Sequence, residues 1–205
     1  ILSFIKPIFY NKSRVSAIHY KLIVDDIRDD LQLMRFLKLI DLVGRDNTLI
    51  VVRGKVNMDR FPGYNFISLN YYDRKYICHA LMHELFIGIW VCLKVSLGLG
   101  INLFPLHKTV VRGYWYYKTL FDRYTSDYII QERHYTTSAI KNYLFKSSGG
   151  IASTSIQKNI IENDHMFYYI DIDYLFSLGN KTIDVAFEYG ARIDKILPVG
   201  SMFME

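Results

Sequence analysis

Short apolar segments alternate with helix-like segments over residues 127–201, and this alternation restricts the possible folds more than any other feature of the chain. Strands are predicted at residues 128–130, 151–156, 174–177 and 193–199. Two helices are predicted between them, at residues 137–145 and 182–189, and Gly149-Gly150 and Gly190 mark their ends. Strands that are separated by helices pair in parallel through crossover connections. We therefore expect an α/β protein with a Rossmann-like, mostly parallel sheet that is flanked by helices.

The first 125 residues show the same two kinds of segment with less regular spacing. The pattern predicts strands at residues 5–10, 48–52 and 65–69, and helices at 26–43, 73–97 and 109–124. Two acidic pairs, Asp25-Asp26 and Asp29-Asp30, flank the start of the first of these helices. Carboxylates are favourable at a helix N-terminus, and this explains both pairs without a functional role. We therefore expect little functional information in residues 1–120.

Charge and cysteine content exclude several classes of protein. The net charge is +5, but the basic residues are scattered, which argues against a nucleic-acid-binding arm. Cys78 and Cys92 are expected to be free thiols in a helix rather than parts of a disulfide framework or a metal site. The most apolar window, residues 85–104, carries Lys94 near its middle, so we expect a buried or interfacial helix rather than a membrane span.

Polar residues follow four consecutive predicted strands. Because parallel strands end at one edge of a sheet, where α/β proteins bind their ligands, these residues are the candidate site. They are Gln131, Glu132, Arg133 and His134; Ser155, Gln157 and Lys158; Gly179, Asn180 and Lys181; and Ser201. Glu132 or His134 can act as a general base, and the cationic side chains can neutralise phosphate. The alternative is that polar residues only fill loops.

Metal sites have weaker support in the sequence. Asp171-Ile-Asp173 satisfies an Asp-x-Asp pattern that can hold a divalent ion, but it precedes its predicted strand instead of following it. His79 and His83 lie one helical turn apart without an evident third ligand. We therefore predict no metal.

Five segments together resemble a known family. They are Asp127-Tyr-Ile-Ile-Gln-Glu132, Asn142-Tyr-Leu-Phe145, Ser155-Ile-Gln-Lys158, Asp173-Tyr-Leu-Phe-Ser-Leu-Gly179 and Ile196-Leu-Pro-Val-Gly-Ser201. This order is similar to the closing half of the N-terminal domain in bacterial surface-polysaccharide glycosyltransferases of the two-domain GT-B type. In one respect the chain departs from them: Lys158 and Asn159 stand where the family has a His-Gly turn. The resemblance therefore supplies no catalytic histidine at that turn.

The resemblance implies a specific activity and organisation. Residues 1–205 would form one Rossmann-like, acceptor-side domain, with 127–201 as its best-supported part and a second domain beyond Glu205 that holds the donor. The reaction would be an inverting, metal-independent transfer of a sugar from a nucleotide donor to a cell-surface glycan, without a cofactor. The protein would be cytoplasmic and peripheral on the inner membrane face, with residues 86–123 in contact with the membrane.

Besides a metal-dependent transferase that would use Asp171 and Asp173, two other functions remain open from the sequence. One is a non-catalytic α/β module that binds a phosphorylated ligand or a partner protein. The other is an enzyme similar to the CDP-alditol phosphotransferases of teichoic acid synthesis, which have a similar order of elements.

Overall fold

The computed structural model describes residues 17–68, 89–132, 139–157 and 170–200. The chain divides into two compact units: residues 1–18 with 71–124, and residues 19–70 with 125–205. The second unit contains the sheet. The described part of the first contains two helices, at residues 89–99 and at α3 (Phe104–Arg123). The strand predicted at 5–10, and Cys78, His79 and His83, lie outside the described residues.

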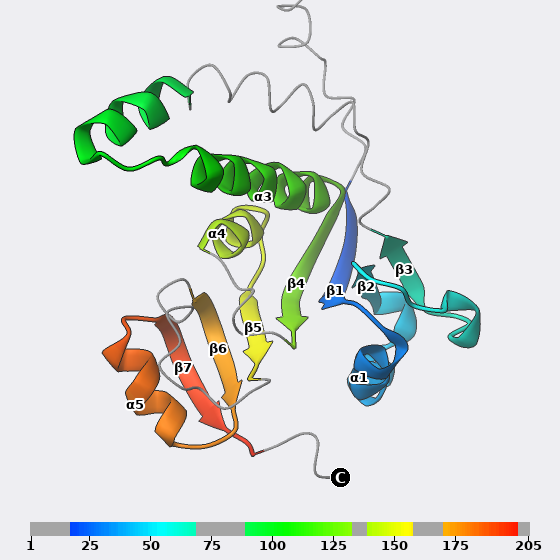
Figure 1. Ribbon diagram of the computed structural model, residues 1–205. Coiled ribbons are helices and arrows are strands. Elements are labelled where there is room, and N and C mark those ends of the chain that lie inside the picture. Colours follow the sequence, from blue (N-terminus) through cyan, green and yellow to red (C-terminus); the bar gives the residue numbers. More distant parts are fainter. Residues whose placement is uncertain (1–16, 69–88, 133–138, 158–169, 201–205) are drawn as a thin grey trace, which may run out of the picture. The chain divides into compact units, whose positions relative to one another are not determined.

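Seven parallel strands form a single sheet in the order β3-β2-β1-β4-β5-β6-β7 (Figure 1). The expected Rossmann-like α/β fold is thus confirmed. The strands are β1 (Ile18–Ile27), β2 (Thr48–Val52), β3 (Asn65–Ser68), β4 (Tyr124–Gln131), β5 (Ala152–Ile156), β6 (Asp171–Ser177) and β7 (Arg192–Pro198). The segment predicted from the alternation, 127–201, supplies four of these seven strands. The other three come from residues 18–68, where the sequence pattern was less regular.

The strand order reverses between β1 and β4. From β1 the chain runs outward through β2 to β3, and β4 then returns to the opposite side of β1 and continues to β7. In open parallel sheets such a switch point leaves a crevice at the carboxyl ends of the two central strands, where ligands bind. The carboxyl ends of β1 and β4 are therefore the first place to look for a site.

The helix α1 (Asp30–Val43) follows β1 and packs on the centre of the sheet. Asp29 caps its first turn by accepting a hydrogen bond from the Gln32 backbone N–H at 2.8 Å. Gly44 ends it with φ 100, a conformation that favours glycine. Its buried stripe of Leu33, Phe36 and Ile40 joins the core formed by β1, β2, β4 and β5.

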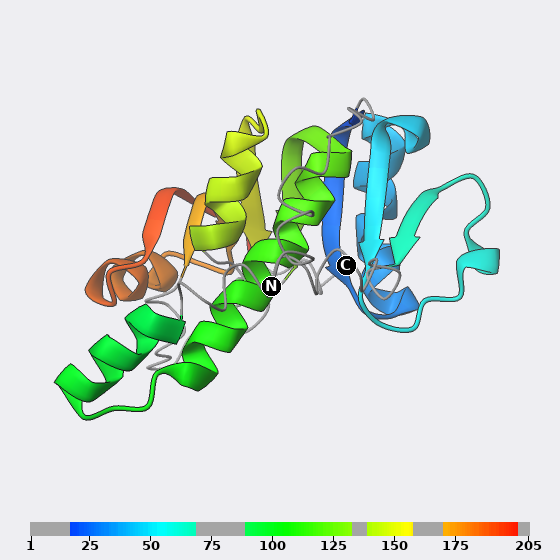
Figure 2. The ribbon, with the colours of Figure 1, turned by 90° about the horizontal axis from the view of Figure 1, so that it is seen from above.

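Two further helices complete the unit that holds the sheet. The helix α4 (Ala139–Ser147) leads into β5, and α5 (Lys181–Glu188) connects β6 to β7. Seen from two directions, α5 lies beside β6 and β7, at the edge of the sheet opposite β3 (Figures 1 and 2). A second core of Ile170, Ile172, Leu175 and Ala186 holds α5 there.

Several sequence-based boundaries were wrong. The strand β4 begins at Tyr124 instead of residue 128, and β6 begins at Asp171 instead of residue 174, so the Asp-x-Asp pair lies inside its strand and does not precede it. The helix predicted from residue 26 begins at Asp30, and residues 18–27 form the central strand β1. Asp29 and Asp30 do lie at a helix N-terminus as expected, but Asp25 and Asp26 are inside a strand and fully buried. The helix predicted at 109–124 begins earlier, at Phe104, with Pro105 in its first turn, where proline is well tolerated.

Candidate functional site

Two adjacent carboxylates lie at the carboxyl end of β1, on the switch point of the sheet. Asp25 and Asp26 are both fully buried. The pairing of β1 with β2 shifts by one residue between Val24 and Ile27, which defines a β-bulge, and Asp26 takes φ 63 within it. Positive φ is unusual for a residue other than glycine, and bulges next to functional sites change the direction of side chains. The bulge therefore brings two consecutive acids to one group of cations.

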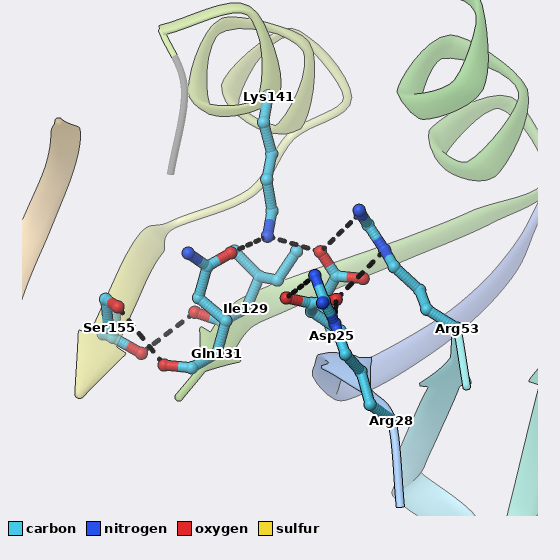
Figure 3. A network of polar contacts seen from close by, with 9 residues as sticks. Asp25, Arg28, Arg53, Ile129, Gln131, Lys141 and Ser155 are labelled. Carbon is cyan, nitrogen blue, oxygen red and sulfur yellow. Dashed lines mark hydrogen bonds and ion pairs between the residues drawn. The ribbon is translucent and has the colours of Figure 1, made fainter. Parts of the chain in front are cut away.

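Three cations surround the two carboxylates. Lys141 Nζ, from α4, lies 2.5 Å from Asp25 Oδ2, and Arg53 Nη2 lies 3.5 Å from the same oxygen. Arg53 Nε lies 3.6 Å from Asp26 Oδ1, which Arg28 Nε also contacts at 3.1 Å. Figure 3 shows Lys141 reaching Asp25 from the helix above, Arg53 from the right of the view and Arg28 from below. Among the described residues, the cluster therefore has three positive charges for two negative ones.

The ionisation of this cluster follows from its burial and its pairing. Burial alone would raise the pKa of Asp25, but the charges of Lys141 and Arg53 outweigh burial and hold this pKa below its ordinary value of 3.8. Burial also lowers the pKa of Lys141, an effect that the charge of Asp25 opposes. At neutral pH, Asp25 is therefore an ionised carboxylate inside the protein.

Three buried polar atoms around this end of β1 make no hydrogen bond among the residues that the structure describes. They are Asp25 Oδ1, Gln32 Nε2 and Arg53 Nε, of which the last still forms an ion pair with Asp26. Gln32 is 3% exposed, and its other side-chain atom, Oε1, accepts a hydrogen bond from the Arg28 backbone N–H at 2.9 Å. Unsatisfied buried polar groups are rare in proteins and costly, so they mark positions where function overrides stability.

Close packing of the backbone keeps Arg53 next to the acids. The N–H of Arg53 donates to the Ile27 carbonyl at 2.7 Å, and the N–H of Lys55 donates to the Arg28 carbonyl at 2.9 Å. Gly54 lies between these two bonds, and a Cβ atom there would lie 2.0 Å from the Arg28 carbonyl oxygen. Only glycine permits this approach, so Gly54 is part of the architecture of the site.

The predicted site residues in β4 lie at the same edge, but they are committed to internal contacts. Gln131, 2% exposed, accepts a hydrogen bond from Lys141 through Oε1. Glu132, also 2% exposed, forms an ion pair with Arg35 of α1. Ser155 of β5 is buried and donates to the Gln131 carbonyl at 3.3 Å. These three residues join β4, β5, α1 and α4 around the switch point.

The other predicted residues are farther along the carboxyl edge or outside the described residues. Gln157 follows β5, and its Oε1 accepts hydrogen bonds from the Leu178 N–H at 2.9 Å and the Thr182 hydroxyl at 2.8 Å. Gly179, Asn180 and Lys181 form the turn into α5, where the last two are exposed. The remaining predicted residues lie outside the part of the chain that the structure describes: Arg133, His134, Lys158 and Ser201.

The Asp-x-Asp pair lies at the opposite edge of the sheet. Asp171 and Asp173 are at the amino end of β6. Asp171 accepts a hydrogen bond from Asn142 at 2.7 Å, and Asp173 accepts one from the Ser153 N–H at 2.6 Å and pairs with Lys146 at 2.8 Å. Burial would raise the pKa of Asp173, but Lys146 and Ser153 outweigh it and lower this pKa. Within the described residues, no three potential ligands lie close enough to hold a metal ion.

An open groove lies next to the acidic pair. It has a volume of about 580 Å³ and is lined by the start of α1 and the segment after β2: Asp29, Asp30, Leu31, Lys55, Val56 and Asn57. Asp29 directly follows Arg28, and Lys55 is hydrogen-bonded to Arg28, so the groove adjoins the cation cluster. Known proteins offer no guide to its ligand. No family model, curated protein or solved structure matches this chain.

No functional role was predicted for the charged residues that meet at the carboxyl end of β1: Asp25, Asp26, Arg28, Arg53 and Lys141. Two signals were present in the sequence. The run Leu22-Ile-Val24 directly before the acids is typical of a buried strand, and Arg53-Gly54 follows the predicted strand at 48–52. Reading residues 22–24 as a strand would have placed two acids at a strand end.

Proposed function

We propose that this chain is the acceptor-side domain of an inverting, metal-independent glycosyltransferase, which transfers a sugar from a nucleotide donor to a cell-surface glycan. The observation that carries the proposal is the switch point between β1 and β4, with its charged residues and adjoining groove at the carboxyl edge. Parallel α/β sheets bind their substrates at this place. The donor would be held by a second domain beyond Glu205, as the sequence resemblance implies.

Within this proposal, Glu132 and His134 are the two candidate bases. An inverting transfer needs a group that removes the proton from the acceptor hydroxyl. Glu132 lies at the carboxyl end of β4, next to the switch point, where it forms an ion pair with Arg35. The same pair also links β4 to α1, so a structural role must be separated from a catalytic one.

Matched variants separate these two roles. Glu132→Gln and Arg35→Gln each remove the same ion pair, so a purely structural role predicts similar losses of activity and stability. If Glu132 is the base, Glu132→Gln lowers transfer by at least about 100-fold, while Arg35→Gln retains most of it. The assay is transfer from nucleotide sugars by the natural protein, with thermal unfolding as the control for folding. Equal effects in both variants move the base to His134, and His134→Asn then tests that residue.

The metal-independent part of the proposal has a separate test. Transfer should be unchanged after treatment with EDTA. The Asp-x-Asp pattern of the sequence consists of Asp171 and Asp173. These two residues lie at the edge of the sheet opposite the groove. Activity that is lost on chelation and restored by Mg²⁺ or Mn²⁺ would contradict the proposal.

A second candidate function is a non-catalytic module that binds a phosphorylated ligand. Among the residues that the structure describes, Arg28, Arg53 and Lys141 surround two carboxylates, and this gathering of cations favours this function independently of any transfer. Such a module would bind ligand at the groove but show no turnover with any nucleotide sugar.

We also propose that the unit with residues 89–123 contacts an anionic membrane surface. None of the described helices is long and apolar enough to cross a membrane. Large apolar side chains are nevertheless exposed on and after the helix at 89–99, namely Trp90, Val91, Leu97, Leu99 and Ile101. Lys94 lies 5.3 Å from the centre of the Trp90 ring. Apolar and aromatic side chains with nearby cations are typical of helices that lie in a membrane interface.

A further inference from the structure

The guanidinium of Arg28 contacts a buried carboxylate on one side, while the side chain of Arg28 remains partly exposed to solvent. Its Nε and Nη2 lie 3.1 and 3.5 Å from the two oxygens of Asp26, which is fully buried. The side chain of Arg28 is nevertheless 43% exposed. A guanidinium has five N–H donors in a fixed planar fork, so contact with one carboxylate leaves donors on the other side. Asp26 therefore fixes the orientation of a cation whose outer side faces solvent.

Arg53 extends this arrangement to a second cation. It lies 3.5 Å from Asp25 and 3.6 Å from Asp26, and 27% of its side chain is exposed. Two guanidinium groups that share one carboxylate repel each other, and Lys141 adds a third positive charge to the same cluster. An anion at the exposed side of Arg28 and Arg53 relieves this repulsion. Arg28 Nε and Arg53 Nε lie 3.1 and 3.6 Å from the same oxygen, Asp26 Oδ1, so the two guanidinium groups are close to each other.

The adjoining groove restricts the kind of anion. Lys55 adds another cation to its wall, while the Asp29 and Asp30 carboxylates and the Asn57 side chain supply hydrogen-bonding groups. Asp30 is already engaged with the Asn57 N–H and with Arg60, each at 2.8 Å. Carboxylate oxygens accept hydrogen bonds from hydroxyl groups, whereas they repel a bare anion. A ligand that joins a phosphate to a sugar fits this surface, because the phosphate can bind the cations and the sugar hydroxyl groups can donate hydrogen bonds to the carboxylates.

We propose that Arg28 and Arg53, oriented by the buried Asp25-Asp26 bulge, bind the phosphate of a sugar phosphate whose sugar lies in the groove formed by Asp29, Asp30, Lys55 and Asn57. Bidentate binding of phosphate is the characteristic use of arginine. The phosphate can belong to a nucleotide or to a phosphorylated sugar of the acceptor. A sugar phosphate is thus the ligand class for the proposed function. Binding of this ligand does not depend on the proposed function, whereas the reaction that follows binding does.

Binding is tested with the 205-residue chain by calorimetric titration with UDP, glucose 1-phosphate and glucose. Saturable binding of either phosphate compound but not of glucose is expected. Arg28→Gln should weaken it at least tenfold. The matched control is Arg192→Gln, at the amino end of β7 on the opposite edge of the sheet, which should change binding less than twofold. No saturable binding, or equal binding by Arg28→Gln and wild type, overturns the proposal.

A second measurement avoids mutation in case Arg28→Gln does not fold. Phenylglyoxal modifies exposed arginines, and Arg28 and Arg192 are both accessible, with 43% and 83% of their side chains exposed. UDP or glucose 1-phosphate should protect Arg28 and leave Arg192 reactive, as measured by peptide mass spectrometry. Equal modification of Arg28 with and without ligand contradicts the site. Tighter binding of UDP identifies a nucleotide, and tighter binding of glucose 1-phosphate identifies a phosphorylated sugar. Neither experiment requires turnover, so a failed transfer assay does not affect them.

Discussion

Lys141 Nζ lies 2.5 Å from Asp25 Oδ2, although the two residues are 116 positions apart in the chain and both are buried. This ion pair joins the helix α4 to the end of the central strand β1. Removing one member of a buried pair leaves the other charge without compensation, which costs about 3–5 kcal/mol. The pair is therefore the contact of the sheet that we expect to be most sensitive to a single substitution.

Lys141→Met should lower the free energy of unfolding by about 3 kcal/mol, at the low end of that range because Arg53 remains near Asp25. The control is Lys118→Met, which removes an ion pair of the same length to Asp122 on a helix surface. This exposed pair should contribute less than about 1 kcal/mol. Urea denaturation measures both variants. Similar losses of unfolding free energy in the two variants would show that the buried pair contributes no more to stability than the exposed pair.

The pairing of Asp25 also predicts how stability depends on pH. Because the pKa of Asp25 is lower in the folded protein than the ordinary value of 3.8, the unfolded chain binds the proton more readily. The stabilisation is therefore fully present above pH 3.8 and is lost as the pH falls through the folded pKa. Asp25→Asn should remove this component. The test is to measure the urea midpoints of the wild type and the variant from about pH 2 to about pH 7, a range that covers the titration of a carboxyl group. The two sets of midpoints should converge at the acid end, and parallel curves would contradict the prediction.

Gly54→Ala should destabilise the fold, since the added methyl group would lie 2.0 Å from the Arg28 carbonyl oxygen. Backbone atoms cannot move aside as a flexible side chain can, so we expect a loss of about 1–3 kcal/mol. Gly113→Ala is the control, because a Cβ atom at this helical position meets nothing within 4 Å. That variant should be neutral or more stable by up to about 1 kcal/mol. Thermal unfolding compares the two.

Substitutions at Asp26 separate its backbone conformation from its charge. Asp26→Gly and Asp26→Ala both remove the contacts with Arg28 and Arg53, but only glycine adopts φ 63 without steric cost. Asp26→Gly should therefore be more stable than Asp26→Ala by about 1 kcal/mol. Chemical denaturation of the two variants measures the difference. Equal stability would mean that the bulge does not strain the backbone.

The membrane proposal predicts that Leu97→Glu reduces co-sedimentation with vesicles that contain phosphatidylserine. Leu97 is 78% exposed on the helix at 89–99, so a charge there should not disturb a core. Leu42→Glu is the matched control, because Leu42 is 86% exposed on α1 in the other unit. Wild type and Leu42→Glu should bind the vesicles, and binding should fall as salt rises. Failure of the wild type to bind would contradict the proposal.

The regular part of the sheet could be predicted from local patterns, and the site could not. The run Thr48–Val52 is apolar and β-branched, and it forms a strand whose five residues are all buried. The strand β1 was missed because Asp25 and Asp26 interrupt its apolar run, and acids in a strand are expected only where distant cations compensate them. Those cations, Arg53 and Lys141, come from segments 28 and 116 residues away from Asp25. No local pattern carries that information.

The sheet edge was nevertheless predicted to hold the polar residues of four strands. Gln131, Ser155 and Gln157 do lie at the carboxyl edge, but each is buried and hydrogen-bonded inside the protein. A sequence shows that a residue follows a strand, while the direction of its side chain depends on which neighbouring groups need a partner. Glu132, for example, has its partner in Arg35 of α1, which is 97 positions away in the chain.

The extra residue in β1 also restricts which mutations the chain can tolerate during evolution. Side chains alternate between the two faces of a regular strand, so deletion of one residue near Asp26 would restore the alternation and separate the two acids. Each would then face a different layer of the protein, one of them without a cation. An ordinary one-codon deletion, harmless in many loops, would here dismantle the charged cluster and the position of Arg28 in a single step.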